Sequence, residues 1–125
     1  MNQRLVNLDV MIGEGNPGAV AVRHRAAQGS GVQDCLIDAR HGHTGLEGGC
    51  GSGGSHAGVT VLGGRIGLDL RETQPASTIV GFILIGQTEA AILYAGRQSL
   101  SAVGLRIESD VQGPVIIDPA HHRRA

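Results

Sequence analysis

Hydrophobic and polar residues alternate in short runs along the chain, and the same order of runs recurs. The clearest copy, GFILIGQTEAAILYAG at 81–96, has a short apolar run, a polar corner, a second apolar run and a glycine turn. The same order begins at five positions that are 21–27 residues apart: Asn7, Asp34, Gly58, Gly81 and Ala102. A period of two residues is typical of strands with one buried face, and self-similarity at this spacing is typical of stacked coils. The pattern predicts an all-β solenoid of about five coils.

Stacking the five units places apolar residues above one another in two rows. The first row contains Leu8, Cys35, Val59, Phe82 and Val103, and the second contains Val10, Ile37, Val61, Leu84 and Leu105. Parallel strands one coil apart lie about 4.8 Å from each other, so five coils form a rod about 24 Å long. We interpret Asn7 and Asp34, which open successive units, as ladder or turn residues. The glycine-rich segment 42–58 is the least regular, and we expect a long surface turn that leaves the stack.

Composition narrows the kind of core that such a stack can have. Hydrophobic residues make up 41% of the 125 residues but aromatic residues only 2%, which favours a thin aliphatic interior. The 21 glycines lack the period of collagen and are interrupted by Val, Ile and Leu runs, so we interpret them as turns. We predict one β-helix domain over residues 1–118 and a polar tail over 119–125.

The scattered charge and the lack of recognisable targeting segments narrow the classes of partner that we expect. The net charge is −1 and the ten basic residues, all arginine, are scattered, so no nucleic-acid partner is expected. No apolar span of about twenty residues and no signal-peptide core are found, so neither a membrane helix nor a signal peptide is expected in this chain. We interpret Cys35 as a buried thiol and Cys50 as a loop thiol, not as a disulfide framework, and their redox state stays open.

The coil pattern over about residues 5–108 resembles the right-handed parallel β-helix proteins of the pectate-lyase-like superfamily. NLDVMIGEGNPGAVAVRHRAAQGSGVQDCLIDA and the segment from Ser55 to Glu108 carry this resemblance, which is to the coils and not to a catalytic motif. It implies a polysaccharide-binding or polysaccharide-cleaving protein, with lyase or glycoside hydrolase activity if it is an enzyme, and an extracellular location. Members of that superfamily have more coils and a helical cap, so we expect a fragment or a chain completed by a partner.

Carboxylates at outward strand positions are the candidate residues for sugar chemistry, which requires paired acids at a defined separation. We single out Glu47 and Asp69 as candidate catalytic acids with Arg71, which could neutralise a uronate, and add His43 as a candidate substrate-binding residue. The alternative is that the acidic residues are solvated outward positions of strands, a set that contains Asp9, Asp34, Asp38, Glu47, Asp69 and Glu72.

Two further motifs offer different chemistry. His41, His43 and Glu47 have the spacing of a cupin's first metal motif, and His56 could add a further ligand for a divalent metal; solvated loop histidines are the alternative. No other cofactor is expected. GEGNPG at 13–18 fits the dinucleotide fingerprint G-x-G-x-x-G, with Asp38 twenty residues after Gly18. Alternating residues follow it where a helix would have to begin, so a plain turn is the preferred interpretation.

Two functional hypotheses follow from the sequence. The first is a polysaccharide-binding or polysaccharide-processing β-helix scaffold, incomplete as an enzyme, with polysaccharide as its partner. The second is a structural module that assembles without catalysis. Both predict a homo-oligomer, because the terminal coils of a rod expose strand edges and aliphatic side chains with few charged residues near them.

Overall fold

The computed structural model describes residues 4–24, 31–48, 55–71, 78–94, 101–111 and 115–117. Cys50, Glu72 and the tail 119–125 lie outside the described residues. Within the described ranges the chain contains strands and turns and no helix. The strands form three sheets of five strands each, and every strand pair is parallel.

Each sheet takes every third strand of the chain. Sheet A consists of β1 (Arg4–Val6), β4 (Gly31–Gln33), β7 (His56–Ala57), β10 (Thr78–Val80) and β13 (Ser101–Val103). Sheet B consists of β2 (Asp9–Met11), β5 (Leu36–Asp38), β8 (Thr60–Leu62), β11 (Ile83–Ile85) and β14 (Arg106–Glu108). Sheet C consists of β3 (Val20–Arg23), β6 (Thr44–Glu47), β9 (Ile66–Leu70), β12 (Ala90–Tyr94) and β15 (Val115–Ile117).

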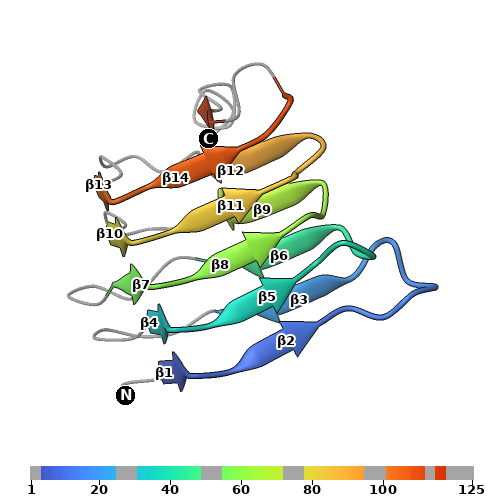
Figure 1. Ribbon diagram of the computed structural model, residues 1–125, viewed down its shortest axis with the longest axis horizontal. Helices are drawn as coiled ribbons and strands as arrows, with labels where there is room; N and C mark the ends of the chain where they lie inside the picture. The colour runs from blue at the N-terminus through green and yellow to red at the C-terminus, as the bar shows by residue number, and fades with distance from the viewer. Residues whose placement is uncertain are drawn as a thin grey trace.

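The chain rises through these sheets as a continuous coil. In Figure 1 the strands of sheet B run left to right across the front, and those of sheet C lie behind them, while the chain rises from the N-terminus at the bottom. Each coil contributes one strand to each sheet, so pairing occurs between one coil and the next. The predicted fold class, an all-β right-handed parallel β-helix, is confirmed.

A narrow aliphatic core fills the space between the three sheets. In sheet B the register places Ile37, Val61 and Leu84 above one another, and all three side chains are 0% exposed. Fully burying such a side chain stabilises the fold by about 1.5–3 kcal/mol. Phe82 is also fully buried in this interior, and Cys35 is a buried free thiol, as the sequence indicated.

The corner between sheets A and B has the same backbone conformation in every coil. Its residues are all in the left-handed region, with φ between 53° and 67°: Asn7, Asp34, Gly58, Gly81 and Gly104. Glycine, asparagine and aspartate tolerate this conformation best, which explains the residue types found there. The interpretation of Asn7 and Asp34 as turn residues is confirmed.

The register predicted for the last coil is wrong by two residues. Val103 pairs with Val80 in sheet A, and Ile107, not Leu105, pairs with Leu84 in the core row. The corner residue of this coil is Gly104, so the unit begins there and not at Ala102. A shift of two residues keeps alternating side chains on the same face, so the alternation could not reveal the error.

The described parts of the segment 42–58, residues 42–48 and 55–58, are more regular than predicted. Thr44–Glu47 forms β6 within sheet C and His56–Ala57 forms β7 within sheet A, with Leu46 fully buried. These residues therefore belong to the stack and not to a turn that leaves it.

Gly13–Gly18 is a turn, and the strand β3 follows it where a dinucleotide-binding protein has a helix. Without that helix N-terminus the pyrophosphate lacks its binding site. The dinucleotide hypothesis is wrong.

Candidate functional site

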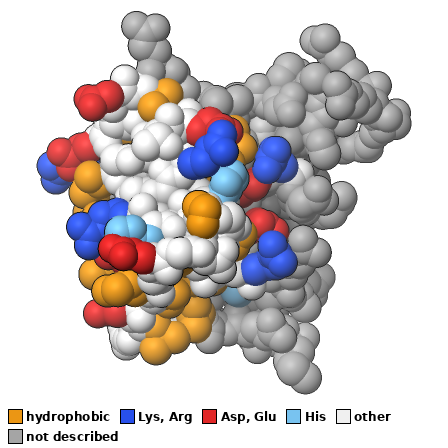
Figure 2. Space-filling view, turned by 90° about the vertical axis from the view of Figure 1, so that its right-hand side faces the viewer, with side chains coloured by type: hydrophobic (Ala, Val, Ile, Leu, Met, Phe, Trp, Pro, Cys, Tyr) orange, Lys and Arg blue, Asp and Glu red, His pale blue; other side chains and the backbone are white. Residues whose placement is uncertain are grey.

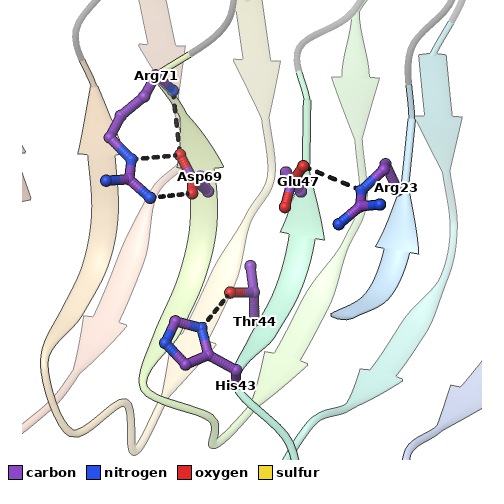
Figure 3. Close-up of polar contacts among 6 residues, drawn as sticks. All are labelled: Arg23, His43, Thr44, Glu47, Asp69 and Arg71. Atoms are coloured by element: carbon purple, nitrogen blue, oxygen red, sulfur yellow. Dashed lines mark hydrogen bonds and ion pairs between the residues drawn. The ribbon is translucent and has the colours of Figure 1, made fainter. Parts of the chain in front are cut away.

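The parallel register of sheet C places charged residues side by side on neighbouring strands. Arg23 of β3 pairs with Glu47 of β6, and Glu47 pairs with Asp69 of β9. Arg71 follows β9 and folds back onto Asp69, as Figure 3 shows. We call these four residues the charged row. Three residues selected from the sequence, Glu47, Asp69 and Arg71, are thus brought together by the fold.

Asp69 and Arg71 form a closely held ion pair. One carboxylate oxygen of Asp69 accepts hydrogen bonds from the backbone N–H of Arg71 at 3.1 Å and from its Nε at 3.0 Å, and the other accepts from Nη2 at 2.8 Å. The side chain of Asp69 is only 9% exposed. Burial would raise the pKa of Asp69, but the hydrogen bonds from Arg71 and the charges of Arg71 and His43 lower it below its ordinary value.

Glu47 lies between two other charges of the row. Its carboxylate accepts a hydrogen bond from Arg23 Nε at 3.0 Å, and Arg23 is the more exposed partner. The neighbouring strand that carries Asp69 lies about 4.8 Å away, so the two acidic residues are close. The charged row therefore has two acidic residues at its centre and one arginine at each end.

His43 immediately precedes β6, at the opposite end of this strand from Glu47 (Figure 3). Its Nδ1 is 2.8 Å from the hydroxyl oxygen of Thr44, a buried residue at the first position of the strand. Its charge also contributes to lowering the pKa of Asp69. The sequence-based grouping of His43 with Glu47, Asp69 and Arg71 thus corresponds to one surface in the structure.

The Asp69–Arg71 arrangement recurs at the end of a strand in sheet B. Asp38 accepts hydrogen bonds from the backbone N–H, Nε and Nη2 of Arg40 at 3.1, 2.9 and 2.7 Å. The side-chain hydrogen bond from Arg40 is the main cause that lowers the pKa of Asp38 to about 2. Sequence reasoning selected Asp38 without its partner; the Asp-x-Arg spacing at both strand ends is the signal that would have found the pair.

The candidate metal ligands do not converge. His56 is fully buried and its ring nitrogens contact Val32 N and Gly48 O, at 2.9 and 3.0 Å. His41 is exposed and lies 3.9 Å from the carboxylate of Glu14. Among the residues that the structure describes, no group of three or more His, Cys, Asp or Glu side chains is placed to hold a metal ion.

The charge arrangement limits the chemistry of the row. Glu47 and Asp69 lie on neighbouring strands, but glycoside hydrolysis by a pair of carboxyl groups needs one of them as a protonated acid. Asp69 stays ionised because its pKa is lowered, and Arg71 binds both of its oxygens. The row therefore fits charge-assisted binding better than proton transfer.

Oppositely charged side chains also lie together on the side of the stack seen in Figure 2. There acidic and basic side chains are interspersed with hydrophobic ones and are not gathered by sign. Arg65 and Glu89 of successive coils form an exposed ion pair at 2.7 Å.

Comparison with known proteins found no matching family model, curated protein or solved structure. Membership of the pectate-lyase-like superfamily stays a prediction from the coil pattern. No helix in the described ranges has the length and apolar character needed to span a membrane.

Proposed function

We propose that this protein is a structural scaffold that assembles by stacking one β-solenoid on another through the ends of its coils. The observation that carries the proposal is the exposure of apolar side chains in the two terminal coils. Leu8 is 44% exposed and Leu105 is 36% exposed, whereas Val59 and Phe82, at the same position in inner coils, are 0% exposed. A further coil on either side is what buries this position in the interior of the stack.

The same contrast holds for the last strand of sheet A. All three residues of β13 are exposed, whereas Ile79, which pairs with Ala102 of that strand, is only 1% exposed, and Val103 is 64% exposed. Exposed strand edges with apolar side chains favour pairing with another chain. Few charged residues oppose this in sheet B: its end strands carry Asp9 in β2 and Arg106 and Glu108 in β14, and the last two form an ion pair with each other.

Sedimentation equilibrium of the whole chain at micromolar concentrations tests this proposal. We expect an average mass that rises with concentration above the 12.8 kDa of one chain. Leu105→Lys should reduce association because it places a charge in the contact. Arg65→Lys, an exposed change in a middle coil, is the control and should leave the mass unchanged. A monomer at every concentration would contradict the proposal.

We propose binding of an acidic polysaccharide to the charged row as a second candidate function. The row supports this because it presents two arginines, with side chains 58% and 44% exposed for Arg23 and Arg71, on the surface of a sheet. Guanidinium groups bind carboxylates through paired hydrogen bonds, which suits a uronate. The carboxylates that already contact these arginines would compete with the ligand, so we place this candidate second.

A glycan panel that contains neutral and uronate polysaccharides tests the second candidate. We expect binding of uronate polymers only, and loss of that binding in Arg71→Gln. Arg65→Gln removes an exposed arginine from a middle coil away from the row and should retain it. Binding that is insensitive to Arg71→Gln, or absent altogether, would contradict this candidate.

A further inference from the structure

We infer that the copies join head to tail and in register, so that β2 of one copy pairs with β14 of the next as if it were the strand of a further coil. This inference rests on the proposed assembly function and adds the polarity and the residue pairing of the contact. A second copy of this chain is the only partner that it requires.

The backbone hydrogen bonds that join one coil to the next follow a regular pattern. The strands at the two ends of the stack could continue this pattern across a junction between copies. At the corner, the N–H groups of Asp34, Gly58 and Gly81 each donate to a carbonyl of the next coil, at 2.9, 2.8 and 2.8 Å. In the opposite direction, Thr60 N–H donates to Cys35 C=O of the preceding coil at 3.0 Å. Repeating the same step across the junction brings Gly104 N–H to Val6 C=O of the next copy.

Side chains in matching rows are compatible across this junction. The register that relates one coil to the next places Val103 against Val6, Leu105 against Leu8 and Ile107 against Val10 of the next copy. Val6, Leu8, Val103 and Leu105 are among the exposed large hydrophobic residues of the chain. All three contacts would therefore pair apolar residues with each other across the junction.

The two ionised residues that this register would bring together, Asp9 and Arg106, have opposite signs. One outward row of sheet B contains Asp9, Leu36, Thr60, Ile83 and Arg106, so its two charges lie at its two ends. Head-to-tail stacking places Arg106 beside Asp9 of the next copy. Arg106 also forms an ion pair at 3.2 Å with Glu108 of its own strand, whose register position faces the uncharged Met11 of the next copy. A head-to-head contact would not bring Asp9 and Arg106 together.

This polarity determines the kind of assembly. A contact between two different surfaces leaves one of each kind free, so the product is an open series and not a closed dimer. Each copy would add about 24 Å to the rod, from five strands spaced about 4.8 Å apart. The average mass should therefore keep rising with concentration and not reach a plateau at twice the mass of one chain.

Charge reversal tests the junction in the whole chain by sedimentation equilibrium. Asp9→Arg and Arg106→Glu each place like charges together, and each should weaken self-association by about tenfold. An equimolar mixture of the two variants should recover association, because the new carboxylate of one variant then faces the new guanidinium of the other. The double variant should recover it alone. Circular dichroism spectra and melting temperatures confirm that each variant is folded.

Glu89→Arg reverses an exposed charge in a middle coil and is the matched control, expected to leave association unchanged. Wild-type association that is unaffected by the end reversals, or that the mixture does not restore, overturns the head-to-tail inference and leaves the assembly function standing. A wild-type chain that stays monomeric overturns both.

Discussion

The backbone N–H of Val32 donates a hydrogen bond of 2.9 Å to Nδ1 of His56 in the interior of the stack. Because Nδ1 accepts, the proton of the neutral ring is on Nε2, which donates to Gly48 C=O at 3.0 Å. The ring therefore joins β4 to the end of β6. It also meets the ring of His24 edge-on, with centroids 5.2 Å apart. A protonated His56 could not accept from Val32.

Stability should consequently fall on acidification. Burial lowers the pKa of His56 from 6.5 to about 4, so the unfolded chain binds the proton more readily than the folded one. The stabilisation is complete above about pH 6.5 and is lost as the pH falls toward 4, by about 3 kcal/mol. Urea denaturation at a series of pH values measures it. His56→Gln, which can keep both hydrogen bonds but does not titrate, should flatten the curve; an unchanged slope would contradict this assignment.

The core row of sheet B predicts that two substitutions in the same coil lower the free energy of unfolding by very different amounts. Leu84→Asp should cost about 3–5 kcal/mol, because it buries an unpaired charge between Val61 and Ile107. Glu89→Ala, in an ion pair with Arg65 at the exposed corner, should cost under about 1 kcal/mol. Since the whole fold is stable by about 5–15 kcal/mol, only the first should approach unfolding. Equal costs in chemical denaturation would refute the register.

The left-handed corner predicts which residues can replace its glycines. Gly81 has a φ of 64°, and a Cβ there would meet no atom closer than 3.7 Å, so the cost of substitution comes from the backbone and not from a clash. Gly81→Val should cost about 1–2 kcal/mol, and Gly81→Asn should cost less, because Asn7 occupies the same corner in the first coil. A thermal melt that ranks the two variants in the opposite order would be inconsistent with the corner.

The ion pair at the end of β9 predicts a change in titration. Arg71→Gln removes the charge and the side-chain hydrogen bonds that lower the pKa of Asp69, while its burial remains, so the pKa should rise above that of the wild type. NMR titration of the Asp69 carboxyl measures this directly. Arg40→Gln should raise the pKa of Asp38 and leave Asp69 unchanged, which controls for a general effect of lost positive charge.

Much of the fold could be predicted because sheets B and C bury alternate aliphatic residues. Ile37, Val61 and Leu84 show the period of two, and successive coils repeat it at similar spacing. Sheet A could not be recognised, since its strands mix apolar residues with small and polar ones, including the buried histidine His56, so no alternation repeats from coil to coil.

The sequence allowed us to predict which residues form the candidate surface, but not which hydrogen bonds and ion pairs they make. Glu47 and Asp69 are conspicuous as acids after apolar runs, and stacking the coils brings them together. Their hydrogen-bond partners depend on the three-dimensional structure. Glu47 binds Arg23 of the preceding coil, whereas Asp69 binds Arg71, which folds back onto the end of its own strand. The glycines that precede His56 predict a loop, whereas the residue lies in β7, where two backbone groups bind its ring nitrogens and make its burial favourable.

Disulfide cross-linking between the two ends tests the central claim, head-to-tail stacking, most directly. Val6→Cys and Val103→Cys are placed in separate chains in which both native cysteines are replaced by alanine, and the two are mixed under oxidising conditions. In-register stacking puts the two Cα atoms about 4.8 Å apart, within the range that a disulfide spans. We expect the mixed cross-link between one Val6→Cys chain and one Val103→Cys chain to dominate over either self cross-link. Cross-links that form only between identical variants, or none at protein concentrations where the wild type associates, would contradict the claim.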